Sequence, residues 1–391
     1  MSKSISLILL FETITKHKMF GTKITLTNRI PGLDLARAIA ICLVVFAHSL
    51  WISGNYPESI SWLMQLSGTI GVEIFFVISG FLIGKIIYKI ILKDDFSLKD
   101  VYHFWVRRWF RTLPNYYFIL ILNIVLWFSI YKELPEKIIL YFFYLQNLTT
   151  TSPAFFRISW SLAVEQFCYI IGPLSLFFLI RIFPKKDKKF LFLVMSLIII
   201  LIFIFIRIRL SMTHTITSIY QWNESLRKVT LYRLDAIYYG FVAYYFINKY
   251  KSSVTIDKIL FCCGSISVLF LNFFIFNFGI SVERNPEFFI IYYLPLHSIS
   301  ICFLLPFLIT LKIQSNLFLK WITLISVLSY SIYLLHYTII LHGMKTIFPS
   351  DSFSGLLLLA YTLIYWFLVL VFSYLQYRFF EKPMTDLRDK N

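Results

Sequence analysis

Arg37 and His48 lie on the first long apolar stretch of the chain, with ten residues between them. A charged side chain at the centre of a membrane helix costs about 2.5–3.5 kcal/mol on insertion scales, so such residues usually face the protein interior and belong to a functional site. At about 1.5 Å of rise per residue, the two side chains are roughly 16 Å apart along one helix. This distance suits a site that holds a charged donor at one end and carries out proton chemistry at the other.

Three further clusters of ionisable residues stand at the ends of apolar stretches. Glu73 lies in GVEIFFVISGFL, at a depth in its helix similar to that of His48. Arg108 and Arg111, in RWFRTLP, are one helical turn apart at the predicted cytoplasmic entry of the next helix. Glu165, in WSLAVEQFCY, is predicted about one turn inside its helix. These side chains are candidates for binding a charged ligand and for orienting a catalytic base.

Two later motifs extend the pattern. Arg233 and Asp235, in YRLDAIYYG, are two residues apart and do not face each other on a helix, so each is expected to have a separate partner. Tyr330 and His336 belong to SYSIYLLH, and FEKP follows near the end of the chain. A structural role is an equal alternative for Arg233, Asp235 and His336. The remaining candidates for substrate binding or support are Trp160, Ser161 and Tyr169.

The composition identifies the class of protein that must position these residues. Of 391 residues, 59% are hydrophobic and 15% are charged, which excludes an ordinary soluble domain and a disordered chain. Basic cytoplasmic loops account for the net charge of +17, so no nucleic-acid partner is expected. The five cysteines lack the spacing of metal ligands, and no metal is expected. The chain is predicted to be an all-α, polytopic integral membrane protein in contact with membrane lipids.

Ten apolar stretches approach the length of about 20 residues that a membrane-spanning helix needs. They cover residues 36–54, 67–92, 113–131, 160–181, 190–206, 230–248, 259–277, 293–311, 321–342 and 355–378. A shorter apolar piece at residues 138–148 is predicted not to cross, because its crossing would place the basic loop at residues 181–189 outside. Ten crossings place both termini in the cytoplasm.

The predicted organisation is a cytoplasmic or interfacial tail at residues 1–33, a transmembrane domain at residues 34–380 and a cytoplasmic tail at residues 381–391. Translation from Met19 rather than Met1 is an open alternative.

One predicted outer loop departs from the positive-inside rule. The segment before the sixth apolar stretch is predicted to lie on the outer side, although it contains four basic residues. They are Arg207, Arg209, Arg227 and Lys228. The position of this loop is therefore the least regular part of the predicted topology.

In this order, the motifs resemble those of the membrane acyltransferase family 3, the bacterial cell-surface O-acyltransferases. The resemblance rests on Arg37 and His48 with their spacing, and on GVEIFFVISGFL, RWFRTLP, WSLAVEQFCY, YRLDAIYYG and SYSIYLLH, and it extends over residues 33–387. It implies a protein of the bacterial inner membrane that transfers an acyl group, usually acetyl, from acyl-CoA to a hydroxyl of a surface glycan. The glycan would be a lipopolysaccharide, an exopolysaccharide, peptidoglycan or a related polymer, and no metal is implied.

The residues agree with this implied donor. Acetyl-CoA is cytoplasmic and polyanionic, so Arg37, Arg108 and Arg111 are expected to hold its phosphates by charge-assisted hydrogen bonds.

The implied reaction also needs a base for the acceptor hydroxyl. His48 is the expected base, because an imidazole titrates near neutrality. Glu73 or Glu165 is expected to orient the imidazole and to stabilise the imidazolium. Transfer through an acyl group held on His48 or on Tyr169 remains an alternative to direct transfer.

Two alternatives concern the acceptor and the function. No fused extracytoplasmic hydrolase-like domain is expected in this chain, so the glycan is acylated directly or through a separate extracytoplasmic transferase. A transporter of small organic acids or acyl groups is the rival function, since intramembrane charges also mark transport pathways. The sequence contains no evident inverted repeat of the kind common in transporters.

Overall fold

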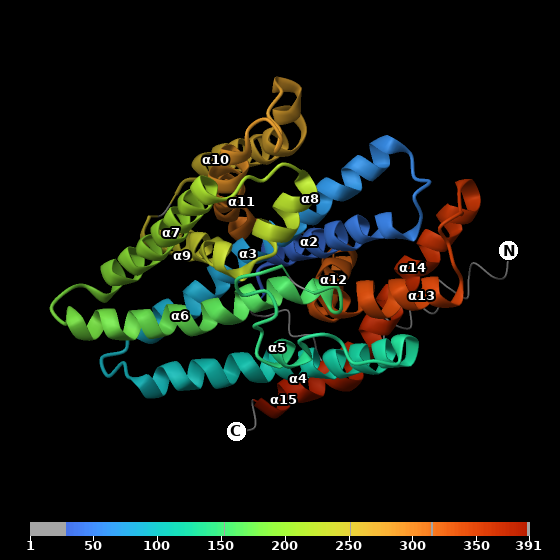
Figure 1. Cartoon of the computed structure of the whole chain (residues 1–391). Helices are drawn as coiled ribbons and strands as arrows, with labels where there is room; N and C mark the ends of the chain where they lie inside the picture. Colours follow the sequence, from blue (N-terminus) through green and yellow to red (C-terminus); the bar gives the residue numbers. More distant parts are fainter. Residues whose placement is uncertain (1–28, 152, 251, 314–315, 389–391) are drawn as a thin grey trace.

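The computed structural model describes residues 29–151, 153–250, 252–313 and 316–388. In these ranges the chain is helical and has no strand, as the composition predicts (Figure 1). Most of the predicted N-terminal tail, with both alternative start sites, Met1 and Met19, lies outside the described residues, and so do residues 389–391.

Nine segments of the described chain are long and apolar enough to cross a membrane, which confirms a polytopic, all-helical membrane protein. Their main helices are α2 (Pro31–Ser49), α3 (Glu58–Ile91), α4 (Leu98–Tyr131), α6 (Trp160–Ile182), α7 (Lys188–Thr213), α10 (Val254–Leu269), α11 (Tyr293–Thr310), α12 (Asn316–Leu335) and α14 (Gly355–Gln376). The predicted sixth helix is α9 (Asp235–Lys249), whose 15 residues are too few for a full crossing.

Helix α9 runs beside α3 in the same direction. Glu73 of α3 pairs with Arg233, and Gly80 meets Gly240, so the contacts advance equally along the two segments. A Cβ added at Gly80 would lie only 1.9 Å from the carbonyl oxygen of Ile237, so only glycine permits this approach of two backbones. Because the two helices are parallel, α9 returns the chain to the end of the bundle that α3 reaches.

Two basic loops that were predicted to share the cytoplasmic side lie together. The α3–α4 and α6–α7 connections occupy one end of the bundle, at the left of Figure 1. There the Lys188 ammonium donates to the backbone oxygen of Lys93 at 2.5 Å. The charges of Arg29 and Arg111 both act on Tyr377, so the two ends of the described chain share one half of the bundle.

The apolar piece at residues 138–148 forms only the short helix α5 (Ile138–Phe142), so it does not cross, as predicted. The hydroxyls of Tyr116 and Tyr117 in α4 each donate to a carbonyl of this helix at 2.8 Å. The other short elements used below are η4 (Arg157–Ser159), η5 (Asn223–Arg227), η10 (His336–Leu341) and α15 (Lys382–Arg388).

Candidate active site

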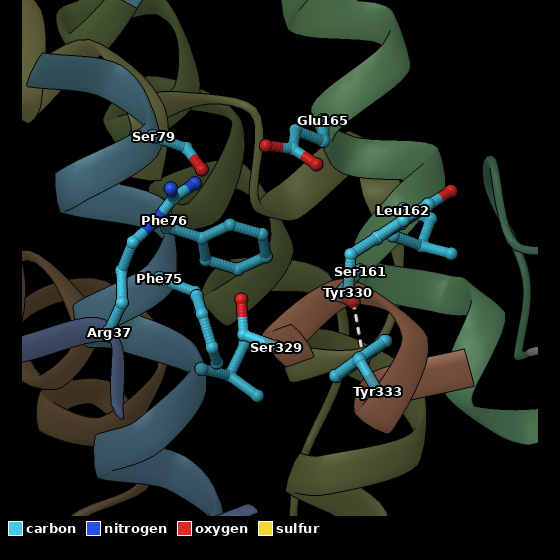
Figure 2. Close-up of a pocket in the computed structure, with 11 residues that line it drawn as sticks. Arg37, Phe75, Phe76, Ser79, Ser161, Leu162, Glu165, Ser329, Tyr330 and Tyr333 are labelled. Carbon is cyan, nitrogen blue, oxygen red and sulfur yellow. Dashed lines mark hydrogen bonds between the residues drawn. The ribbon is translucent and has the colours of Figure 1, made fainter. Parts of the chain in front are cut away.

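A cavity of about 90 Å³ opens between α2, α3, α6 and α12 (Figure 2). Its polar lining consists of Arg37, Ser79, Ser161, Glu165, Ser329, Tyr330 and Tyr333. Its apolar wall consists of Val72, Phe75, Phe76 and Leu162. Four segments that are distant in the sequence thus contribute to one site, and all four carry motifs that the sequence singled out.

Arg37 extends from α2 into this cavity, next to Ser79 in Figure 2. Within the described residues its Nε–H has no hydrogen-bond partner, and the ion pairs found there do not include it. The charges of Arg111, Glu165 and Arg108 all act on its guanidinium. The structure therefore brings together the three arginines that were predicted to bind the donor, around a guanidinium that keeps hydrogen-bonding capacity.

Within this arginine group, Arg108 contacts Tyr169. The Arg108 guanidinium lies over the Tyr169 ring, 5.2 Å from its centre, and the Tyr169 hydroxyl donates to Glu165. The Trp105 indole N–H fixes the same segment by donating to the backbone oxygen of Tyr169 at 2.8 Å. Glu165 thus faces the cavity while it orients Tyr169, and its position is at the arginine end of the site rather than at His48.

His48 lies against His336. The Nδ1 atom of His48 is 3.1 Å from the Nε2 atom of His336, and 2.8 Å from the backbone oxygen of Val44. His336 is fully buried, whereas His48 is partly exposed. The Tyr337 ring completes the group, with its centre 4.7 Å from that of His48.

These hydrogen bonds assign the tautomers of the two neutral imidazoles. The Nδ1 atom of His336 faces the backbone oxygens of Ile332 and Tyr333 at 3.0 and 2.8 Å, so it must carry the proton. The Nε2 atom of His336 is then an acceptor, and the proton of His48 lies on Nδ1, shared between His336 and Val44. This leaves the Nε2 lone pair of His48 outside the pair, where it can accept a proton.

Tyr333 connects the cavity with the histidine pair. It lines the cavity, and its ring centre is 5.9 Å from that of His336. Its hydroxyl donates to the backbone oxygen of Ile158 at 2.9 Å and lies 2.5 Å from Ser161 Oγ, the contact drawn in Figure 2. Tyr333 near the end of α12 and His336 at the start of η10 are within one helical turn, so Tyr333 lies between the arginine cavity and the histidine pair.

Glu73 does not reach His48, so the expectation that it orients the imidazole is corrected. It is fully buried, pairs with Arg233 through Oε1 and lies 3.4 Å from Ser298 Oγ through Oε2. A buried carboxylate needs a cation and hydrogen bonds to offset its desolvation, and here both come from neighbouring helices. His336 occupies the position at His48 that was expected for a carboxylate.

Some of the other predicted residues stabilise the fold, and others contribute to the site. Asp235 accepts two hydrogen bonds from Arg207, at 2.9 and 2.7 Å, so Arg233 and Asp235 do have separate partners as predicted. Trp160 packs edge-on against Phe76, with 5.9 Å between ring centres. Among the cavity residues, Tyr330 donates to the backbone oxygen of Thr112 at 2.8 Å. These contacts hold the walls of the site.

Sequence reasoning missed several members of the site. The partnership of His48 and His336 was not predicted, although both residues were selected, because 288 positions separate them. Ser79, in GVEIFFVISGFL, was not among the predicted site residues, but it lines the cavity. Tyr333 and Tyr337 received no role; the i, i+3 and i, i+4 spacing of Tyr333, His336 and Tyr337 around one helix is the signal that could have indicated them.

Comparison with known proteins identifies the family of this chain. The sequence profile of the acyltransferase domain matches residues 30–378. The chain is 29% identical, over 95% of its length, to a "putative O-acetyltransferase" of Staphylococcus aureus (strain COL), of which it covers 59%. It is 35% identical, over 38% of its length, to the "putative peptidoglycan O-acetyltransferase YrhL" of Bacillus subtilis, covering 24% of that protein.

A third relative is the peptidoglycan O-acetyltransferase OatA of Listeria monocytogenes, 29% identical over 39% of this chain and covering 25% of OatA. The chain thus spans between about a quarter and three fifths of the length of these relatives. No solved structure matches the chain. The names of the relatives do not favour the transporter alternative. Because the profile covers nearly all of the transmembrane bundle, the chain belongs to the acyltransferase domain family, as its motifs indicated.

Proposed function

We propose that this protein transfers an acetyl group from acetyl-CoA to a hydroxyl of a cell-surface glycan. The observation that carries the proposal is the His48–His336 pair, which leaves a free imidazole nitrogen next to a cavity with an incompletely bonded arginine. Acyl transfer to an alcohol requires these two parts: a base for the hydroxyl and a positively charged site for the donor.

In the proposed reaction His48 Nε2 removes the proton of the acceptor hydroxyl while its oxygen attacks the thioester carbonyl carbon. The new C–O ester bond forms, the C–S bond breaks, and the imidazolium returns the proton to the departing CoA thiolate. His336 accepts a hydrogen bond from His48 Nδ1 throughout, which holds the imidazole ring in one orientation.

The donor would bind at the arginine end of the site. Arg108 and Arg111 would contact phosphates of acetyl-CoA near the entry of α4, and Arg37 would point a free N–H toward the thioester end. The cavity of about 90 Å³ is smaller than the engineered cavity of about 150 Å³ that binds benzene, so it supports a short acyl group rather than a fatty acyl chain.

The acceptor is proposed from the relatives. Those named for peptidoglycan indicate a cell-wall glycan, and lipopolysaccharide and exopolysaccharide belong to the same chemical class of surface polymers. The protein would act in the bacterial inner membrane, with the glycan on the outer side. Direct transfer is proposed, with a separate extracytoplasmic transferase as the alternative recipient of the acetyl group.

The test is the base-labile acetyl content of purified surface glycan from cells that lack the protein or express it. Wild type, His48→Ala and Arg37→Ala should be compared at equal protein levels in the membrane. Acetyl ester that depends on wild type and is absent with either variant supports the proposal. Full ester content with His48→Ala would contradict the role of His48, and no ester with wild type would contradict O-acetylation of that glycan.

A further inference from the structure

A second group of basic residues lies near His48, separate from the arginines of the cavity. It consists of Arg157 in η4, Arg227 in η5 and Lys228, and is called the outer basic cluster below. The charges of Lys228 and Arg227 act on His48, and that of Arg157 acts on Lys228. Arg157 also contacts the hydroxyl of Tyr337, the tyrosine whose ring packs against His48.

This cluster lies next to the segments that come one turn before the cavity residues of α3 and α6. Arg227 donates to the backbone oxygen of Gly68, which is one turn before Val72, the first cavity residue of α3. Arg157 comes one turn before Ser161, the first cavity residue of α6. The outer basic cluster and the arginine end of the cavity are therefore two separate positively charged regions, and His48 lies near the first of them.

The outer basic cluster carries more positive charge than its neighbours neutralise. Glu224 pairs with Lys228, and Glu73, whose charge also acts on Arg227, is already paired with Arg233. Arg227 is 7% exposed, and its hydrogen-bond partners in the described chain are neutral: Asn223 Oδ1 at 3.0 Å and the oxygen of Gly68 at 3.1 Å. Its guanidinium also lies over the Trp160 ring, 5.3 Å from the ring centre, and its Nε–H has no hydrogen-bond partner among the described residues.

A buried guanidinium without its own carboxylate is costly to keep. Burial lowers the pKa of Arg227, in the segment between α7 and α9, to about 10, so it remains a cation at neutral pH. The Lys228 side chain keeps 21% of its surface exposed, which leaves a route from outside. The same two residues oppose the positive-inside rule, so a general topological preference does not explain them.

We propose that the outer basic cluster binds an oxyanion of the acceptor, either a phosphate or a carboxylate, and that this contact sets the acceptor hydroxyl against His48. The inference rests on the proposed function for the identity of the acceptor. It adds a substrate class: glycans that carry a negative group close to the acetylated hydroxyl.

Binding is measured first, without donor, on the purified full chain in detergent. The probes are N-acetylglucosamine 1-phosphate, N-acetylmuramic acid and neutral N-acetylglucosamine, and the readout is the dependence of the thermal unfolding midpoint on probe concentration. One or both anionic sugars should stabilise the protein at concentrations about tenfold lower than the neutral sugar requires. The sugar that does so identifies whether the bound group is a phosphate or a carboxylate. Equal stabilisation by all three sugars, or by none, would overturn the proposal.

Charge variants then locate the binding site. Lys228→Gln and Arg157→Gln should each weaken binding of the anionic sugar about tenfold, because each removes a charged donor. Glu224→Gln should strengthen binding, because it releases Lys228 from its ion pair. Exposed Arg209 provides the matched control, and Arg209→Gln should leave binding unchanged.

These opposite signs separate binding from folding. A purely structural role of the Glu224–Lys228 pair predicts that both variants weaken the protein, and that result would overturn the inference. Because the assay contains no acetyl-CoA, wild-type protein that binds the anionic sugar but transfers no acetyl group would contradict the proposed function and leave the outer basic cluster supported.

Discussion

Two regions of buried charge in this bundle differ in how their charges are satisfied. On the α9 side, Arg207 pairs with Asp235 and Arg233 pairs with Glu73, and all four side chains are at most 2% exposed. On the α2 side, Arg37 and Glu165 line a cavity, and no ion pair among the described residues includes either one.

The comparison shows that residue type alone does not distinguish a site from a scaffold. Both regions contain an arginine and an acid within the membrane bundle, and the sequence offered residues of both as site candidates. A buried pair with matched partners has no capacity left for a ligand, whereas a cation that faces a cavity does. The α9 side is therefore expected to determine stability and the α2 side to determine activity.

The largest effect is expected at His48. His48→Ala should lower kcat for acetyl transfer by about 10²–10⁴-fold, the usual contribution of a general base, with unchanged thermal unfolding. The measurement is release of CoA from acetyl-CoA by purified protein in the presence of acceptor. A variant that retains more than a tenth of wild-type kcat would remove His48 from the role of base.

The second effect tests the paired region. Asp235→Asn leaves the Arg207 guanidinium buried and unpaired, so it should destabilise the protein by about 3–5 kcal/mol. Thermal unfolding in detergent measures this loss. The double variant Arg207→Met with Asp235→Leu should recover much of the stability, because neither charge remains. A stable Asp235→Asn protein with reduced turnover would instead place this pair in the active site.

The third effect tests the open region. Arg37→Gln should raise KM for acetyl-CoA by about 10- to 100-fold, corresponding to one or two charge-assisted hydrogen bonds, with a smaller change in stability than Asp235→Asn. Steady-state kinetics with varied donor and fixed acceptor give this value. If KM stays constant and the unfolding midpoint falls, Arg37 is structural like Arg207, and the contrast between the two regions fails.

The smallest effect separates two variants of His336. His336→Gln can keep an acceptor near the position of Nε2 for His48, whereas His336→Leu cannot. Roughly tenfold lower kcat is expected for the leucine variant than for the glutamine variant, at similar KM for both substrates. Equal kcat values would show that the hydrogen bond between the two histidines does not position the base.

The sequence predicts most of this architecture because hydrophobic length and loop charge act locally. Nine of the ten predicted spans and the failure of residues 138–148 to cross followed from these features. The grouping of Arg37 with Arg108 and Arg111 followed from them too. The sequence did not predict which buried side chains pair with each other, because this depends on how the helices are rotated against one another. Glu73 was assigned to His48 because both were predicted at similar depth, but rotation of α3 directs it to Arg233 instead.

The glycine contact between α3 and α9 also has a consequence for motion. Where two backbones meet at Gly80 and Gly240 without side chains between them, the helices cannot slide past each other in small steps, because each displacement drives a carbonyl into the opposite chain. The α3–α9 pair therefore moves as a single rigid body. Opening of the site for entry of a substrate is therefore expected away from this pair, near α4, which leaves much of its surface exposed and carries the Arg108 that would meet the donor first.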